Sequence, residues 1–149
     1  MTKKIEEKIK LLFDKNSVVG DEALKYLTKL SDGTNIVYPY MDSFKELLSS
    51  DNSYMRTRGV ILLARNAKWD KEGKLNGIID DYLKHITDNK PITSRQCIKS
   101  LPLIVKYKPE LTSVIVSALK SADTTIYNDS MKPLVDKDIQ KALEEIQKL

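Results

Sequence analysis

Apolar residues recur at helical spacing along almost the whole chain. In the first segment, Ile5, Ile9 and Leu12 fall on one face of a helix. The single β-rich cluster, residues 114–116, keeps an i, i+3, i+4 frame with its apolar neighbours, so it is also expected to be helical. The pattern therefore predicts an all-α fold, with helices near residues 3–14, 23–30, 39–48, 53–68, 74–87, 91–106, 109–119 and 126–148.

The prolines modify this pattern. Pro39, Pro91 and Pro109 each fall at the start of a predicted helix, where the missing N–H group leaves no hydrogen bond unmade. Pro102 falls inside a predicted helix, so we expect a kink or an early end there. Pro133 is expected to interrupt the last helical region.

A repeat of 37 residues relates the second helices of successive helix pairs. The shift aligns Asp14, Asp51 and Asp88. It also aligns five apolar triplets, which are Val18, Met55 and Ile92; Ala23, Val60 and Cys97; Leu24, Ile61 and Ile98; Leu27, Ala64 and Leu101; and Leu30, Ala67 and Ile104. A fourth copy follows at a looser shift of 35 residues, with Asp123 matching Asp88. Because one helix pair cannot bury its apolar face alone, the repeat predicts stacked pairs that share a core. We expect a single domain whose repeats span residues 3–33, 34–70, 71–108 and 109–149.

The turn at residues 47–56 carries a family resemblance. An Asp lies in the turn and an Arg lies at the start of the second helix in the segment Leu47-Leu48-Ser49-Ser50-Asp51-Asn52-Ser53-Tyr54-Met55-Arg56. This turn resembles the HEAT/armadillo-type helical repeats, and the chain is also similar to small bacterial HEAT-like proteins. The resemblance implies a right-handed α-solenoid of three to four HEAT-like helix pairs. It also implies a concave face, formed by the second helices, on which a partner lies.

The composition excludes several kinds of chemistry. The chain of 149 residues has one cysteine, Cys97, and one histidine, His85, which rules out a disulfide framework and a Cys/His zinc site. The residues around Gly73 and Gly77 do not form a phosphate-binding loop. We therefore expect no enzyme activity, no metal and no cofactor. Because there is no apolar run of about 18 residues and the one thiol is free, we expect a cytoplasmic protein with no membrane partner.

Positive charge is concentrated in two segments. The formal net charge is +4, yet residues 53–69 and 90–108 contain nine of the 25 Lys and Arg residues and no Asp or Glu. Both segments fall on second helices, so the implied concave face is expected to be basic. A basic face of this kind predicts a protein partner with an acidic segment, and nucleic-acid binding through the same face is the alternative. The residues predicted to bind the partner are Arg58, Arg65, Arg95, Lys99, Lys106 and Trp69.

Two other interpretations stay open at this point. In one, the turn aspartates pair with Arg58 and Arg95 in a structural ladder between repeats, and the lysines are simply solvated. In the other, Trp69-Asp70 resembles the aromatic and Asp residues of DNA-repair glycosylases built from HEAT-like repeats, which makes Asp70 the one carboxylate to consider for an enzyme. Of the remaining residues with reactive side chains, Cys97 is expected in the core and His85 at a helix end.

Overall fold

The computed structural model describes residues 2–149, and within them the fold consists of α-helices and short 3-10 turns, without β-strands. The predicted all-α class is confirmed. The helices are α1 (Thr2–Leu11), α2 (Ser17–Gly33), α3 (Met41–Leu48), α4 (Ser53–Arg65), α5 (Lys74–Leu83), α6 (Pro91–Tyr107), α7 (Thr112–Ser121) and α8 (Lys132–Gln147). The 3-10 turns are η1 (Tyr38–Tyr40), η2 (Ala67–Trp69), η3 (Lys84–Thr87), η4 (Pro109–Leu111) and η5 (Thr124–Ile126).

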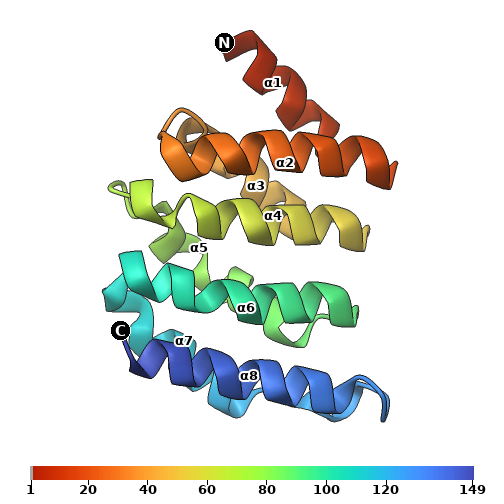
Figure 1. Cartoon of the computed structure of the whole chain (residues 1–149), viewed down its shortest axis with the longest axis vertical. Coiled ribbons are helices and arrows are strands. Elements are labelled where there is room, and N and C mark those ends of the chain that lie inside the picture. Colours follow the sequence, from red (N-terminus) through yellow and green to blue (C-terminus); the bar gives the residue numbers. More distant parts are fainter. Residues whose placement is uncertain (1) are drawn as a thin grey trace.

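Alternate helices form one row. Figure 1 shows α2, α4, α6 and α8 side by side in chain order, with α3, α5 and α7 behind them and α1 beyond α2. Along the row, α4 contacts both α2 and α6, and α6 contacts α8. The helices α1, α3 and α7 each pack against the row helix that follows them in the chain. A row helix in the middle of the molecule is therefore covered on several sides.

Two of the repeat-related apolar triplets lie wholly in the core, whereas Val18 and Ile92 of the first triplet are exposed. Ala23, Val60 and Cys97, which the 37-residue shift aligns, are all fully buried at equivalent places in α2, α4 and α6. The aligned residues Leu27, Ala64 and Leu101 are buried one turn further along the same helices. Core burial of Cys97 is thereby confirmed, and the shared stripe explains why successive row helices pack at the same level.

Asparagine side chains cap two of the row helices. At the start of α2, Oδ1 of Asn16 accepts hydrogen bonds from the N–H groups of Val18 and Val19, at 2.9 and 3.1 Å. At the start of α4, Oδ1 of Asn52 accepts from the N–H group of Met55 at 3.2 Å. Such caps satisfy N–H groups that have no partner within the helix, so they fix where each row helix begins.

The prolines sit mostly where a helix begins. Pro91 is the first residue of α6, while Pro39 and Pro109 lie in the 3-10 turns η1 and η4. Pro102 does not end α6, which continues to Tyr107, so the expected early end is wrong. Pro133 is the second residue of α8 and opens that helix instead of interrupting it, because the first turn of a helix needs no N–H donor there.

Two kinds of feature are not found among residues 2–149. None of their helices has the length and hydropathy that crossing a bilayer requires. No three of their His, Cys, Asp and Glu side chains gather closely enough to hold a metal ion. The polar features of the fold lie in the turns between helices and in a hollow between α6 and α8.

Candidate partner-binding groove

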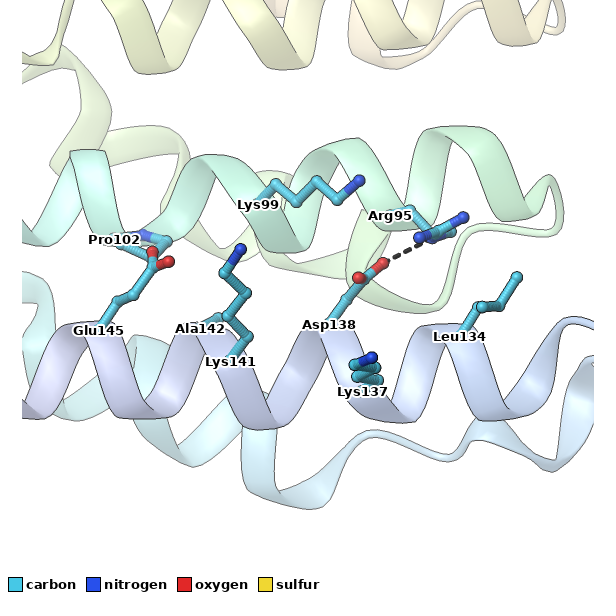
Figure 2. Close-up of a pocket in the computed structure, with 9 residues that line it drawn as sticks. All are labelled: Arg95, Lys99, Pro102, Leu134, Lys137, Asp138, Lys141, Ala142 and Glu145. Carbon is cyan, nitrogen blue, oxygen red and sulfur yellow. Dashed lines mark hydrogen bonds and ion pairs between the residues drawn. The ribbon is translucent and has the colours of Figure 1, made fainter.

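Arg95 and Lys99 line a hollow between the last two row helices, which we call the α6–α8 groove (Figure 2). Its volume is about 520 Å³. The helix α6 contributes Arg95, Lys99 and Pro102, and α8 contributes Leu134, Lys137, Asp138, Lys141, Ala142 and Glu145. Four of these nine side chains are cationic and two are anionic, so the groove carries a positive charge.

One ion pair joins the two walls of the groove. Nε of Arg95 donates a hydrogen bond to Oδ2 of Asp138 at 2.6 Å, and this bond raises the pKa of Arg95. The pair links the first half of α6 to the first half of α8. Because Asp138 already neutralises the guanidinium, Arg95 adds little free positive charge to the groove.

Three lysines supply the unpaired charge. Lys99, Lys137 and Lys141 are exposed, and none of them takes part in an ion pair within residues 2–149. Figure 2 shows Lys141 extending from α8 toward α6, the helix that carries Lys99. Like charges held this near one another favour an anion between them, because the anion relieves their repulsion.

Lys137 and Lys141 are not among the binding residues predicted from the sequence. They lie on α8, which also carries Asp136, Asp138 and Glu145 and is therefore not an acid-free segment. The signal that indicates them is helical spacing, because Lys137 and Lys141 are four residues apart and so lie on one side of α8.

Arg58 is not part of any exposed surface, so its predicted role in binding is wrong. Its side chain is 1% exposed, and Nη1 donates to the carbonyl oxygens of Leu12 at 2.7 Å and Asp14 at 2.9 Å. Burial lowers its pKa, partly offset by the charges of Asp21 and Asp14. In the row, the side of α4 that carries Arg58 is covered by α2 and the turn before it.

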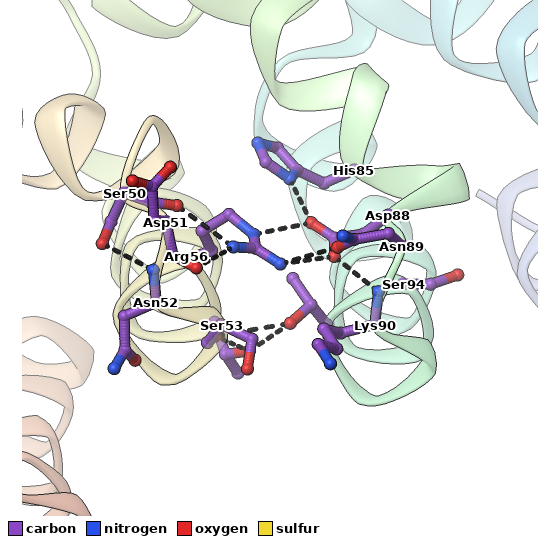
Figure 3. A network of polar contacts seen from close by, with 12 residues as sticks. Ser50, Asp51, Asn52, Ser53, Arg56, His85, Asp88, Asn89, Lys90 and Ser94 are labelled. Atoms are coloured by element: carbon purple, nitrogen blue, oxygen red, sulfur yellow. Dashed lines mark hydrogen bonds and ion pairs between the residues drawn. The ribbon is translucent and has the colours of Figure 1, made fainter. Parts of the chain in front are cut away.

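A different arginine of α4, Arg56, pairs with the turn aspartate Asp88. Nε and Nη2 of Arg56 donate to Oδ2 and Oδ1 of Asp88, both at 2.9 Å, while Nη1 donates to the carbonyl oxygens of Ser50 and Asp51, both at 3.1 Å (Figure 3). This bidentate pair joins the turn before α4 to the turn before α6. Arg56 is the arginine of the HEAT-like turn pattern, whereas the predicted ladder used Arg58 and Arg95.

His85 belongs to the same network. It is the second residue of η3, directly after α5 ends, which agrees with the helix end predicted for it. Its Nδ1 atom lies 2.8 Å from Oδ2 of Asp88, and the N–H group of Lys90 donates to Oδ1 of Asp88 at 2.9 Å. Burial opposes ionisation of Asp88, but the hydrogen bonds from His85 and Arg56 outweigh it and hold the pKa of Asp88 well below its usual range. The network therefore keeps a buried aspartate charged.

Three further predicted residues lie apart from the groove. Arg65 of α4 forms an ion pair with Asp32 at 2.8 Å, in which both side chains are about half exposed. Trp69 is half-buried, and its Nε1 atom donates to the carbonyl oxygen of Ser31 at 2.7 Å, so it packs in a turn between helix pairs and does not line the groove. Lys106 is exposed and lies over the ring of its neighbour Tyr107. Only Arg95 and Lys99 of the predicted set come together.

Asp70 is fully engaged in structural contacts. Its two carboxylate oxygens accept hydrogen bonds from the N–H groups of Lys74 and Leu75 at the start of α5, both at 2.9 Å. The hydroxyl of Tyr38 donates at 2.5 Å, and the ammonium of Lys108 lies 3.3 Å away. Burial raises the pKa of Asp70, but the hydrogen bonds from Tyr38 and from the α5 backbone outweigh burial and lower it. Asp70 thus caps α5 and does not face the groove.

Comparisons with protein-family models, with curated proteins and with solved structures gave no match to this chain.

Proposed function

We propose that this chain is a non-enzymatic binding scaffold, a right-handed α-solenoid of HEAT-like helix pairs that holds an acidic segment of a protein partner in the α6–α8 groove. The row of alternate helices and the shared burial of repeat-related positions support the solenoid. The pairing of Arg56 with Asp88 between successive turns supports the HEAT-like character of the repeat.

The observation that carries this function is the set of unpaired lysines in the groove. Lys99, Lys137 and Lys141 face one hollow from two adjacent helices, with Glu145 as the unpaired acid beside them. Carboxylates of a partner would replace water around these ammonium groups, and the positive field would steer the partner to the groove. The lysine stems add apolar contact area once their charged ends are engaged.

The lining of the groove favours a protein partner over nucleic acid. Asp138 and Glu145 would lie against any phosphate backbone that ran the length of the groove, and like charges repel. Leu134, Pro102 and Ala142 offer apolar contacts that a phosphate backbone does not use. A peptide with carboxylates at intervals fits a surface in which positive, negative and apolar side chains alternate.

The test is fluorescence anisotropy with labelled polyglutamate and with labelled duplex DNA, each at low and at moderate salt. The variant is Lys99→Glu/Lys141→Glu. Its matched control is Lys25→Glu/Lys29→Glu, which makes the same charge change at two exposed lysines of α2, a helix that does not border the groove. Circular dichroism confirms that both variants keep the helical fold.

The expected result is that the groove variant binds polyglutamate about tenfold more weakly than wild type and the control variant binds as wild type does. Tighter binding of DNA than of polyglutamate, with a steep loss as salt rises, would replace the protein-scaffold function with nucleic-acid binding. Equal loss in both variants would show that only net charge matters and would overturn the groove as the site.

A further inference from the structure

Two large aliphatic side chains are exposed near the starts of α6 and α8. Ile92, the second residue of α6, is 75% exposed, and Leu134, which lines the groove near the start of α8, is 39% exposed. Exposed aliphatic side chains at the same end of two adjacent helices offer apolar contact area to a partner.

The two helices carry matching patterns along the groove. Ile92 precedes Arg95 by three residues and Lys99 by seven, so the three share a face of α6. Leu134 precedes Asp138 by four residues and Lys141 by seven, so they share a face of α8. Arg95 and Asp138 pair across the groove, and Ile92 and Leu134 each precede their member of this pair by about one helical turn, while Lys99 and Lys141 follow it. Helical spacing therefore puts the two apolar residues on the same side of the ion pair, where α6 and α8 begin.

We propose that Ile92 and Leu134 form an apolar anchor site, which selects partner segments that carry a large aliphatic side chain two helical turns from their carboxylates. The inference rests on the proposed function and names the chemistry of its ligand more closely. Seven residues of an α-helix rise about 10 Å, which is also the rise along α6 from Ile92 to Lys99. A helical partner segment with a leucine and a glutamate seven residues apart can therefore place the leucine at the anchor and the glutamate at the lysines.

Charge complementarity points to this occupant. The cationic middle of the groove attracts carboxylates, and the apolar end favours an aliphatic side chain, which gains free energy when it is removed from water. Glu145 lies at the opposite end of the groove from Leu134 in Figure 2 and would repel further carboxylates there. A uniformly acidic segment therefore uses only part of the groove, whereas a segment with an apolar residue at one end uses its full length.

The experiment compares three labelled helical peptides that share one pair of glutamates. Two carry a leucine two turns before or two turns after the glutamates, which covers both orientations of the bound helix, and the third carries serine at both places. Each is titrated with wild type and with the variants Ile92→Ser and Leu134→Ser. The matched control is Val18→Ser, because Val18 is also an exposed β-branched second residue of a row helix and lies on α2, away from the groove.

The expected result is that one leucine peptide binds wild type about fivefold more tightly than the serine peptide. The advantage disappears in Ile92→Ser and Leu134→Ser and is kept in Val18→Ser. Equal binding of leucine and serine peptides, or an advantage that survives in both groove variants, overturns the anchor but leaves acidic binding by the lysines intact. If no peptide binds wild type, the proposed function fails and the anchor fails with it.

Discussion

Arg56→Met tests whether the buried ion pair between successive turns holds the row of helices together. Methionine keeps most of the aliphatic volume of the arginine but removes every donor. The two carboxylate oxygens of Asp88 lose their bonds from Nε and Nη2, and the carbonyl groups of Ser50 and Asp51 lose theirs from Nη1. Asp88 stays buried, so its charge is left with the donors from His85 and Lys90 alone.

Removing one partner of a buried ion pair costs about 3–5 kcal/mol. Because His85 and Lys90 still donate to Asp88, we expect Arg56→Met to lower the free energy of unfolding by about 3 kcal/mol, the lower end of this range. The whole free energy of unfolding of an ordinary domain is about 5–15 kcal/mol. With a urea dependence of about 2 kcal/mol per molar, the unfolding midpoint falls by about 1.5 M. The fluorescence of Trp69, the one tryptophan, reports the transition because its indole is half-buried in the fold.

The exposed pair of Arg65 with Asp32 provides the control. Both side chains of that pair are about half exposed, so Arg65→Met is expected to cost less than about 1 kcal/mol. A loss for Arg56→Met that is no larger than the loss for Arg65→Met would refute the reasoning, because the buried network would then carry no more weight than a surface contact.

The same variant has a defined pH dependence. The folded state holds the pKa of Asp88 below its unfolded value, so the stabilisation is complete above the unfolded value and is lost as pH falls through the folded one. Arg56→Met raises the folded pKa of Asp88, since the guanidinium hydrogen bonds that lowered it are gone. The difference in stability between wild type and variant is therefore largest near neutral pH and shrinks in acid, which urea titrations at a series of pH values will measure.

Three further substitutions and one reaction follow from the packing. Gly20→Ala is expected to lower the free energy of unfolding by about 3 kcal/mol in urea titrations, because a Cβ atom would overlap the Arg58 guanidinium. Gly77→Ala should instead stabilise α5 by about 0.5–1 kcal/mol, because the space around Gly77 is open. Asp70→Asn should lower the unfolding midpoint strongly, because it removes the buried carboxylate beside the ammonium of Lys108 and leaves that buried charge with only the half-exposed Glu110 as an anionic partner. Burial raises the pKa of the Cys97 thiol, so the thiol should react with a disulfide reagent only at the rate of unfolding. Fast reaction of the native protein would contradict the core position of Cys97.

The sequence predicts the helices well because their period is a local property. Each predicted segment contains an α-helix, and the 37-residue shift places Ala23, Val60 and Cys97 at one level of the core before any contact is known. The ends are less predictable. Three residues of 3-10 turn replace α-helix at several boundaries, and the balance between these conformations depends on packing against the next pair.

The roles of the α4 arginines require the tertiary structure. Arg56 and Arg58 are two residues apart, so their side chains leave α4 about 200° apart. Arg56 reaches forward to Asp88, and Arg58 reaches back to the carbonyl groups of Leu12 and Asp14. A helical wheel for one helix gives these directions, but it does not give the neighbours that cover each side. Charge alone therefore assigns both arginines to a binding surface, whereas in the structure both connect α4 to its neighbours.

The unpaired positive charge of the α6–α8 groove comes from lysines, because the arginines are engaged in contacts between helices. Arg56 and Arg58 are used to fix α4 between its neighbours, and Arg95 is neutralised by Asp138 where it fixes α6 against α8. Of the basic residues counted along the sequence, Arg56, Arg58, Arg95 and the buried Lys108 are engaged in contacts between helices, whereas Lys99 is exposed and forms no ion pair with residues 2–149. Because lysine carries its charge on a flexible stem, Lys99 can move to meet a carboxylate without disturbing the helices. In the proposed function, the α6–α8 groove binds and releases an acidic segment while the row that supports it stays fixed.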